Sequence, residues 1–218
     1  MAAKPILYSY FRSSASWRVR IVLALKGIDY EYRAVNLVKD GGHQKKDEFT
    51  ALNPMGQVPV LVVGDVAISQ SLAIIDYLED VYPNNPITPR DPIKKAQARS
   101  LTELISSGTQ PMLSSTVRAQ VDARELGIDA WMAYWIDRGF TAYEKMVQAT
   151  AGKYSVGDEV TIADVCLVPQ LYNAKRFKVD MSKFPTVTRI INALSELDAF
   201  KAASPEVQPD CPEELRAK

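Results

Sequence analysis

The sequence predicts an α/β domain followed by an all-α domain. Between residues 4 and 82, short apolar runs typical of strands alternate with runs of helical spacing. Residues 82–92 then contain four prolines, which cannot continue a helix. Beyond them, apolar residues recur at spacings of three and four, and strand signals nearly vanish. We therefore expect domains at 1–82 and 93–218, joined by a linker at 83–92.

The first domain is expected to combine a βαβ unit with a ββα unit. Strands are expected at 6–10, 30–35, 59–63 and 66–68, and helices at 16–26 and 71–81. Between the two units lies the polar segment 39–46, which contains Gly41, Gly42 and the only histidine, His43. Glycines in a polar segment favour irregular backbone, so this segment is predicted to be a mobile loop.

Composition and charge exclude several classes of partner. The chain of 218 residues is 47% hydrophobic and has 26 basic and 26 acidic residues, so no overall field attracts nucleic acid or an anionic membrane. No segment reaches the ~18 apolar residues of a membrane span, and the N-terminal apolar run is too short for a signal peptide. Cys166 and Cys211 lie far apart in different contexts, so we expect no disulfide, a reducing compartment and a cytoplasmic location.

The start of the first helix is the most informative stretch. It directly follows a predicted strand. It contains three hydroxyl groups and then two cations, at Ser13, Ser14, Ser16, Arg18 and Arg20. The first turn of a helix carries free backbone N–H groups and the positive end of the dipole, which together favour an anion. We infer that the anion is a thiolate.

Two further positions predict local structure near a ligand. Pro59, after Val58, stands directly before a strand; a trans bond is much commoner there, but such turns can also lock the cis isomer. Ser71 precedes an apolar helical run and is predicted as its N-cap. A capping serine needs no further function, but the neighbouring Gln70 offers an amide to a ligand carboxylate at the same helix start.

The segment around Asp164 predicts structure rather than catalysis. Thr161 can cap a helix while Asp164 reaches back to the Thr161 N–H, and Val160 and Val165 can form a hydrophobic staple. Because backbone donors stabilise the carboxylate, we expect Asp164 to have depressed basicity and no role as a general base.

Together these residues resemble a cytosolic glutathione transferase, with a thioredoxin-like βαβββα domain before an all-helical C-terminal domain. The run Ser13-Ser14-x-Ser16-Trp17-Arg18-Val19-Arg20 resembles the signature of the zeta class, also known as maleylacetoacetate isomerases. The resemblance spans essentially the whole chain, including 8–12, 52–54, 71–75, 105–111 and 173–177. It also favours the cis isomer at Pro59.

The resemblance implies a glutathione-dependent isomerase of tyrosine and phenylalanine degradation. The glutathione thiolate would add to the cis double bond of maleylacetoacetate, the resulting single bond would rotate, and elimination would give fumarylacetoacetate. Glutathione is regenerated and is therefore a cofactor. Small dicarboxylates and α-haloacids such as dichloroacetate are the implied substrates, with no metal, no nucleic acid and no membrane. A homodimer is also implied.

The resemblance assigns roles residue by residue. The Ser14 hydroxyl would activate the sulfur with Ser13 beside it, and Arg176 would bind a substrate carboxylate. Arg12 and Arg18 stay open between a substrate role and a solvated surface charge. The backbone of Val58 would pair with the cysteinyl unit, and Gln70 and Ser71 would hold the γ-glutamyl carboxylate. The implied glutathione site comprises Ser13, Ser14, Ala15, Ser16, Trp17, Arg18, Gln44, Val58, Gln70, Ser71, Gln110, Ser114, Ser115 and Thr116.

Ala15 departs from the family motif, which has cysteine at this position. Because glutathione supplies the reacting sulfur, we expect affinity and rates to change and isomerisation to survive, whereas any reaction that needs a protein thiol is lost. The same substitution excludes a thioredoxin-like redox protein. The resemblance makes detoxifying transfer and dehalogenation side activities rather than rival functions. A non-enzymatic ligand-binding protein on the same scaffold stays open as the alternative.

Overall fold

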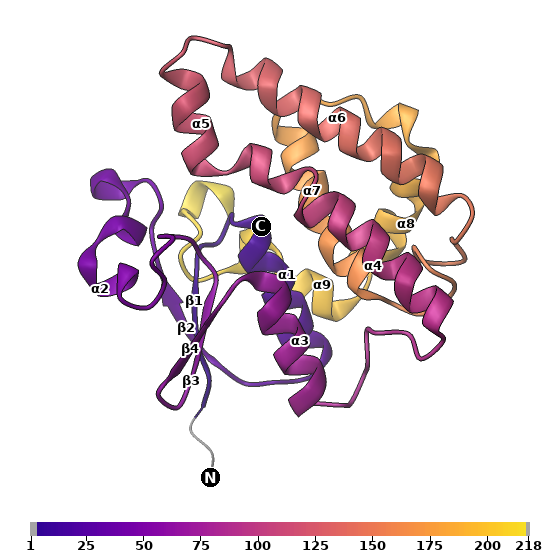
Figure 1. The fold of residues 1–218 in the computed structure, drawn as a ribbon, viewed down its shortest axis with the longest axis horizontal. Helices are drawn as coiled ribbons and strands as arrows, with labels where there is room; N and C mark the ends of the chain where they lie inside the picture. The colour runs from indigo at the N-terminus through magenta and orange to yellow at the C-terminus, as the bar shows by residue number, and fades with distance from the viewer. Residues whose placement is uncertain (1–3, 217–218) are drawn as a thin grey trace. The chain divides into compact units, whose positions relative to one another are not determined.

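The computed structural model describes residues 4–216, and the chain divides into two compact units (Figure 1). One unit comprises the chain up to Asn85 together with the segment from Asp198 onward, and the other comprises 86–197. The first contains a mixed sheet with helices, and the second is helical, which confirms the predicted fold class. Within 4–216, no helix is both long enough and apolar enough to cross a membrane.

The sheet of the first unit has the strand order β2-β1-β3-β4. β1 pairs parallel with β2 and antiparallel with β3, and β3 pairs antiparallel with β4. A parallel pair needs a crossover, which α1 provides between β1 and β2. The strands are β1 Ile6–Ser9, β2 Glu31–Ala34, β3 Val60–Val63 and β4 Val66–Ser69, and the helices are α1 Ser14–Leu25, α2 Asp47–Thr50 and α3 Ser71–Val81.

Helices cover the sheet on both faces. α1 and α3 pack against each other on one side, and α2 lies on the other (Figure 1). Leu7 of β1 is paired with Leu61 of β3, and both are fully buried. Because side chains alternate along a strand, the neighbouring Tyr8 and Val60 face the opposite way, where they pack with Phe49 of α2.

The segment 39–46, predicted as a mobile loop, forms two 3-10 turns. These are η1 Lys39–Gly41 and η2 His43–Lys45. The Asn36 side chain accepts hydrogen bonds from the Val38 and Lys39 N–H groups, and the His43 N–H donates to the Asn36 carbonyl at 2.8 Å. These local bonds hold the polar segment in turns, and its mobility stays a prediction.

The end of the chain belongs to the first unit, which differs from the domain boundary expected at 93–218. It contains α9 Asp198–Ala203, η5 Pro205–Val207 and η6 Glu213–Leu215. The Arg20 Nε donates to the Ala203 carbonyl at 3.0 Å, and the Asp210 carboxylate accepts from the Phe11 N–H at 2.9 Å. Helical periodicity does not report such partners, so the sequence groups this segment with the preceding helices.

The second unit is built around α7, which packs against α4, α6 and α8. Ten of its 15 residues are buried, so this helix is covered on most of its circumference. Between Tyr82 and Asp91 the structure has neither helix nor strand, as expected for the linker. The elements are α4 Pro92–Ser106, η3 Gln110–Leu113, α5 Ser115–Asp122, α6 Ile128–Val147, α7 Ile162–Arg176, η4 Met181–Lys183 and α8 Pro185–Ser195.

Candidate active site

The start of α1 presents donors that no other group within residues 4–216 satisfies. Ser13 is the N-cap, and its Oγ accepts from the Ser16 N–H at 3.2 Å. The N–H groups of Ser14 and Ala15 have no acceptor among residues 4–216. The Ser14 hydroxyl is half-buried and likewise forms no hydrogen bond within the described chain. This arrangement suits an anion, as the sequence predicts.

The next two predicted residues lie deeper. Ser16 is fully buried, and its Oγ has no hydrogen-bond partner in the described structure. Trp17 is also buried. Both are therefore less accessible to a ligand than the half-buried Ser14 and Ala15 at the helix start.

Arg18 is a buried cation rather than a solvated surface charge. Arg18 is only 2% exposed, and its Nη1 donates a hydrogen bond to the Ser71 Oγ at 3.2 Å. Arg20 is 1% exposed and fully engaged by acceptors of its own unit. Arg12 is half-buried, with its guanidinium 5.7 Å from the centre of the Phe11 ring.

The start of α3 differs from the prediction. Gln70, not Ser71, occupies the N-cap position, and its side chain makes no capping bond. Gln70 is exposed and has a φ of 69°, a left-handed conformation that costs a non-glycine residue about 1–3 kcal/mol. Ser71 is the first residue of the helix, and its Oγ accepts from Arg18 instead of capping. This bond brings the starts of α1 and α3 together.

Val58 and Gln44 also keep polar groups free in the first unit. The Val58-Pro59 bond is cis, which confirms the isomer that the resemblance favours. The N–H and C=O of Val58 have no partner in the described chain. Gln44 is buried, its Nε2 lies 3.5 Å from the Leu37 carbonyl, and its Oε1 has no partner within residues 4–216.

The remaining predicted residues lie in the second unit. Gln110 is half-buried at the start of η3. Ser114 is the N-cap of α5 and accepts from the Val117 N–H at 3.3 Å, so its oxygen has a structural role. Ser115 and Thr116 are exposed in the first turn of α5. Arg176 is the exposed last residue of α7.

The start of α7 is closed by its own side chains. The capping box of Thr161 and Asp164 is present, as predicted. The Asp164 carboxylate accepts from the N–H groups of Thr161 at 2.8 Å and Ser155 at 2.9 Å. Burial raises the pKa of Asp164 above its ordinary value despite these donors, so the expected depression was wrong. The group remains structural because it is completely inaccessible.

Known proteins match nearly the whole chain. The family model of the glutathione S-transferase N-terminal domain matches residues 12–81, and that of the C-terminal domain matches 116–202. The maleylacetoacetate isomerase of Rattus norvegicus is 54% identical over 215 residues, which cover 99% of each chain. The solved structure of a bacterial maleylpyruvate isomerase, a zeta-class glutathione transferase, has a TM-score of 0.91 and 39% identity over 95% of this chain and 100% of its own. The chain belongs to the zeta class of glutathione transferases.

A further relative has been solved with ligands. The maleylacetoacetate isomerase of Anaeromyxobacter dehalogenans, with glutathione bound in its active site, has a TM-score of 0.88 and 43% identity over 97% of this chain and 100% of its own. In the zeta-class transferase described here, the free donors at Ser14, Val58 and Arg18 fit a peptide that carries a thiolate and carboxylates.

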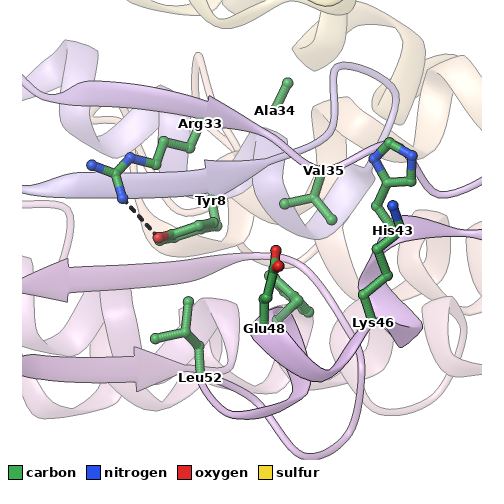
Figure 2. A pocket seen from close by; sticks show the side chains of 9 residues that line it. Tyr8, Arg33, Ala34, Val35, His43, Lys46, Glu48 and Leu52 are labelled. Atoms are coloured by element: carbon green, nitrogen blue, oxygen red, sulfur yellow. Dashed lines mark hydrogen bonds between the residues drawn. The ribbon is translucent and has the colours of Figure 1, made fainter.

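The zeta-class chain also has a pocket that sequence reasoning missed. Its volume is about 490 Å³, and its floor combines the apolar Val35, Phe49 and Leu52 with the basic groups of Arg33 and Lys46. Figure 2 shows the Arg33 guanidinium beside the Tyr8 hydroxyl, to which it donates at 2.9 Å. These residues come from β1, β2, α2 and the segments next to them, so no local sequence pattern predicts the pocket. It contains none of the predicted site residues.

Proposed function

We propose that this chain catalyses the glutathione-dependent isomerisation of maleylacetoacetate to fumarylacetoacetate, in tyrosine and phenylalanine degradation. The observation that carries the proposal is the half-buried Ser14 hydroxyl, which has no partner in the described chain and stands beside the free N–H groups of Ser14 and Ala15. It occurs in a sequence 54% identical to the rat maleylacetoacetate isomerase.

Glutathione, when bound, supplies a thiolate that adds to the cis double bond and leaves again after rotation about the resulting single bond. A free thiol with a pKa near ~8.5 is mostly protonated at neutral pH. The Ser14 hydroxyl can donate to the sulfur, and the N-terminus of α1 adds positive potential, so both favour the thiolate. Ser13 can also donate its hydroxyl proton, although its oxygen already caps the helix.

Other groups of the chain would hold the ligands. The Val58 backbone can pair with the cysteinyl unit, Gln44 can contact the glycyl end, and Gln70 with Ser71 can bind the γ-glutamyl carboxylate. Arg176 would bind one substrate carboxylate through a bidentate pair. The Ala15 methyl group contributes no thiol, so this chain depends on glutathione for its reacting sulfur.

The glutathione thiolate could also displace a halide from a second class of substrate at the same site. An α-haloacid such as dichloroacetate combines a carboxylate, which suits Arg176, with a carbon from which chloride can be displaced. We propose this dehalogenation as a side activity. Cys166 and Cys211 are both buried and form no disulfide in the described structure, which supports a reducing compartment such as the cytosol. The homodimer stays a prediction.

Turnover of maleylacetone, measured with and without glutathione, tests the proposal. We expect isomerisation only when glutathione is present, with the total thiol concentration unchanged at the end. Turnover without glutathione would contradict the mechanism. Tight glutathione binding without any turnover would instead support the ligand-binding alternative. Chloride release from dichloroacetate under the same conditions tests the side activity.

A further inference from the structure

Two buried arginines on α1 differ sharply in how their charges are satisfied. The guanidinium of Arg20 donates from all three nitrogens to the Ala203, Tyr10 and Phe11 carbonyls and the Ser9 Oγ. The guanidinium of Arg18 donates only from Nη1, to Ser71. Its Nε and Nη2 are buried and have no hydrogen-bond partner, and no carboxylate within residues 4–216 pairs with it. The two residues are equally inaccessible, so exposure does not explain the difference.

An unpaired guanidinium in this position is unfavourable. Burying a charge without a partner costs several kcal/mol, about as much as a small domain can spare. A guanidinium cannot relieve that cost by losing its proton. The charge of Arg18 is therefore best explained by an anion that binds close to it.

The Arg18 contact indicates where that anion binds. The Ser71 Oγ accepts from Arg18, so the hydroxyl proton of Ser71 is directed to a different acceptor, and none lies in the described chain. The first hydrogen bond of α3 runs from the Ile74 N–H to the Gln70 carbonyl at 3.0 Å. The N–H groups of the first three helical residues, 71–73, thus have no acceptor within the helix. They lie next to the Ser71 hydroxyl. One cation, one hydroxyl proton and several N–H groups meet at this point.

We propose that Arg18 is a positioning residue for the γ-glutamyl α-carboxylate of glutathione. It holds the oxygen of Ser71 so that the hydroxyl proton points at the carboxylate, and the carboxylate neutralises the charge of Arg18. This inference rests on the proposed glutathione site and adds to it the source of its charge selectivity. Arg20, in contrast, ties α1 to β1 and to the end of the chain.

The test compares glutathione with an analogue in which 4-aminobutyrate replaces the γ-glutamate, so that only the α-carboxylate is missing. Dissociation constants are measured by calorimetry for the wild type, Arg18→Met and Arg18→Lys. We expect Arg18→Met to weaken glutathione about 10- to 100-fold, as for a lost hydrogen bond to a charged group, and to leave the analogue unchanged. Arg18→Lys should recover part of the loss because it keeps the charge without the fork.

Two further variants isolate the route through Ser71. Ser71→Ala should also reduce the preference for glutathione over the analogue, and combining it with Arg18→Met should add little, because the two groups act as a pair. The melting temperature of ligand-free Arg18→Met should equal or exceed that of the wild type, since a buried unpaired charge is removed. As a matched control, Arg20→Lys should lower the melting temperature and keep the ligand preference.

The contrary results are distinct. Equal weakening of both ligands by Arg18→Met and Arg18→Lys would mean that Arg18 only supports the packing of α1 on α3. A higher KM for maleylacetone with unchanged glutathione affinity would assign Arg18 to the substrate instead. Either result would overturn this inference and leave the proposed function standing. Failure of the wild-type protein to bind glutathione would overturn both.

Discussion

The starts of α1 and α7 have similar residues but differ in how their polar groups are hydrogen-bonded. Each helix has a hydroxyl residue at its N-cap position, Ser13 in α1 and Thr161 in α7. In α7, Asp164 at the third helical position returns a carboxylate to the Thr161 N–H and to a neighbouring segment. In α1 the equivalent position is Ser16, whose hydroxyl returns no such bond.

The difference separates structure from function. At α7, the Thr161 and Asp164 side chains are buried and bonded inside the unit, so they stabilise the fold and offer nothing to a ligand. At α1, the Ser14 hydroxyl and two N–H groups lie at a half-buried position without partners in the described chain. Unsatisfied donors have a cost when no ligand is bound, and binding an anion removes that cost.

The largest effect that this comparison predicts is on stability at α7. Asp164→Ala leaves the Thr161 and Ser155 N–H groups buried without an acceptor. Each such group costs about 1–3 kcal/mol, so the free energy of unfolding should fall by roughly 3 kcal/mol or more. Urea unfolding followed by circular dichroism measures this loss. A loss below about 1 kcal/mol would show that water or a rearranged loop satisfies the two groups.

The raised pKa of Asp164 adds a pH dependence with a definite sign. Between the ordinary value near ~3.9 and the raised folded value, the folded chain holds more protons than the unfolded chain. The contribution of Asp164 to stability therefore falls as pH rises through this window. Unfolding free energies of the wild type and Asp164→Asn across the window should show this slope only in the wild type. If the unfolding free energy of the wild type instead rose with pH across this window, the pKa of Asp164 would be lowered in the folded chain, as expected from the sequence.

A smaller effect is expected at the other end of α7, where Arg176 is exposed. Arg176→Ala should raise the KM for maleylacetone about 10- to 100-fold by removing a charge-assisted pair, and should leave the glutathione dissociation constant nearly unchanged. Arg176→Lys should restore part of the loss. Steady-state kinetics and calorimetry provide the two values. Lys175→Ala, at the exposed neighbouring cation, is the matched control and should change neither value.

Equal weakening of substrate and glutathione by Arg176→Ala would contradict this assignment. Arg176 would then have a structural role, and the substrate carboxylate would pass to another cation such as Arg12.

The smallest effect is expected at Ala15 in the first turn of α1. Ala15→Cys should change glutathione affinity and turnover only a few-fold, since about 1 kcal/mol is typical of a small packing change. The introduced thiol should also react quickly with iodoacetamide because a helix N-terminus favours the thiolate. Cys166 and Cys211 are buried and give a slow background. An inactive parent that Ala15→Cys fully rescues would contradict the glutathione-only mechanism.

Local pattern was sufficient for most of the fold. All four strands and both long helices of the first unit lie within two residues of the expected bounds, because alternating and helical spacing are local properties. The capping box at Thr161 was predictable for the same reason. α2 was missed because four residues are too few for a periodic pattern.

Long-range contacts decided the features that sequence could not predict. Ser71 was expected to cap α3, but its oxygen is bound by Arg18, which is 53 positions away. The end of the chain was expected with the helical domain, but Ala203 accepts from Arg20 across 183 positions. Charge alone left Arg18 open between the surface and the substrate, and the resemblance placed it in the glutathione site. Its burial beside Ser71 is what indicates a positioning role there.

Titration of the thiolate absorbance of the glutathione complex shows whether Ser14 activates the thiol, when the wild type, Ser14→Ala and Ser13→Ala are compared side by side. The wild type should show a thiol pKa below the ~8.5 of a free thiol. Ser14→Ala should raise that pKa and lower turnover about 10- to 1000-fold, the range for one catalytic donor. Ser13→Ala should mainly lower stability through its cap. An unchanged thiol pKa in Ser14→Ala would contradict the account and assign activation to Ser13 or the backbone.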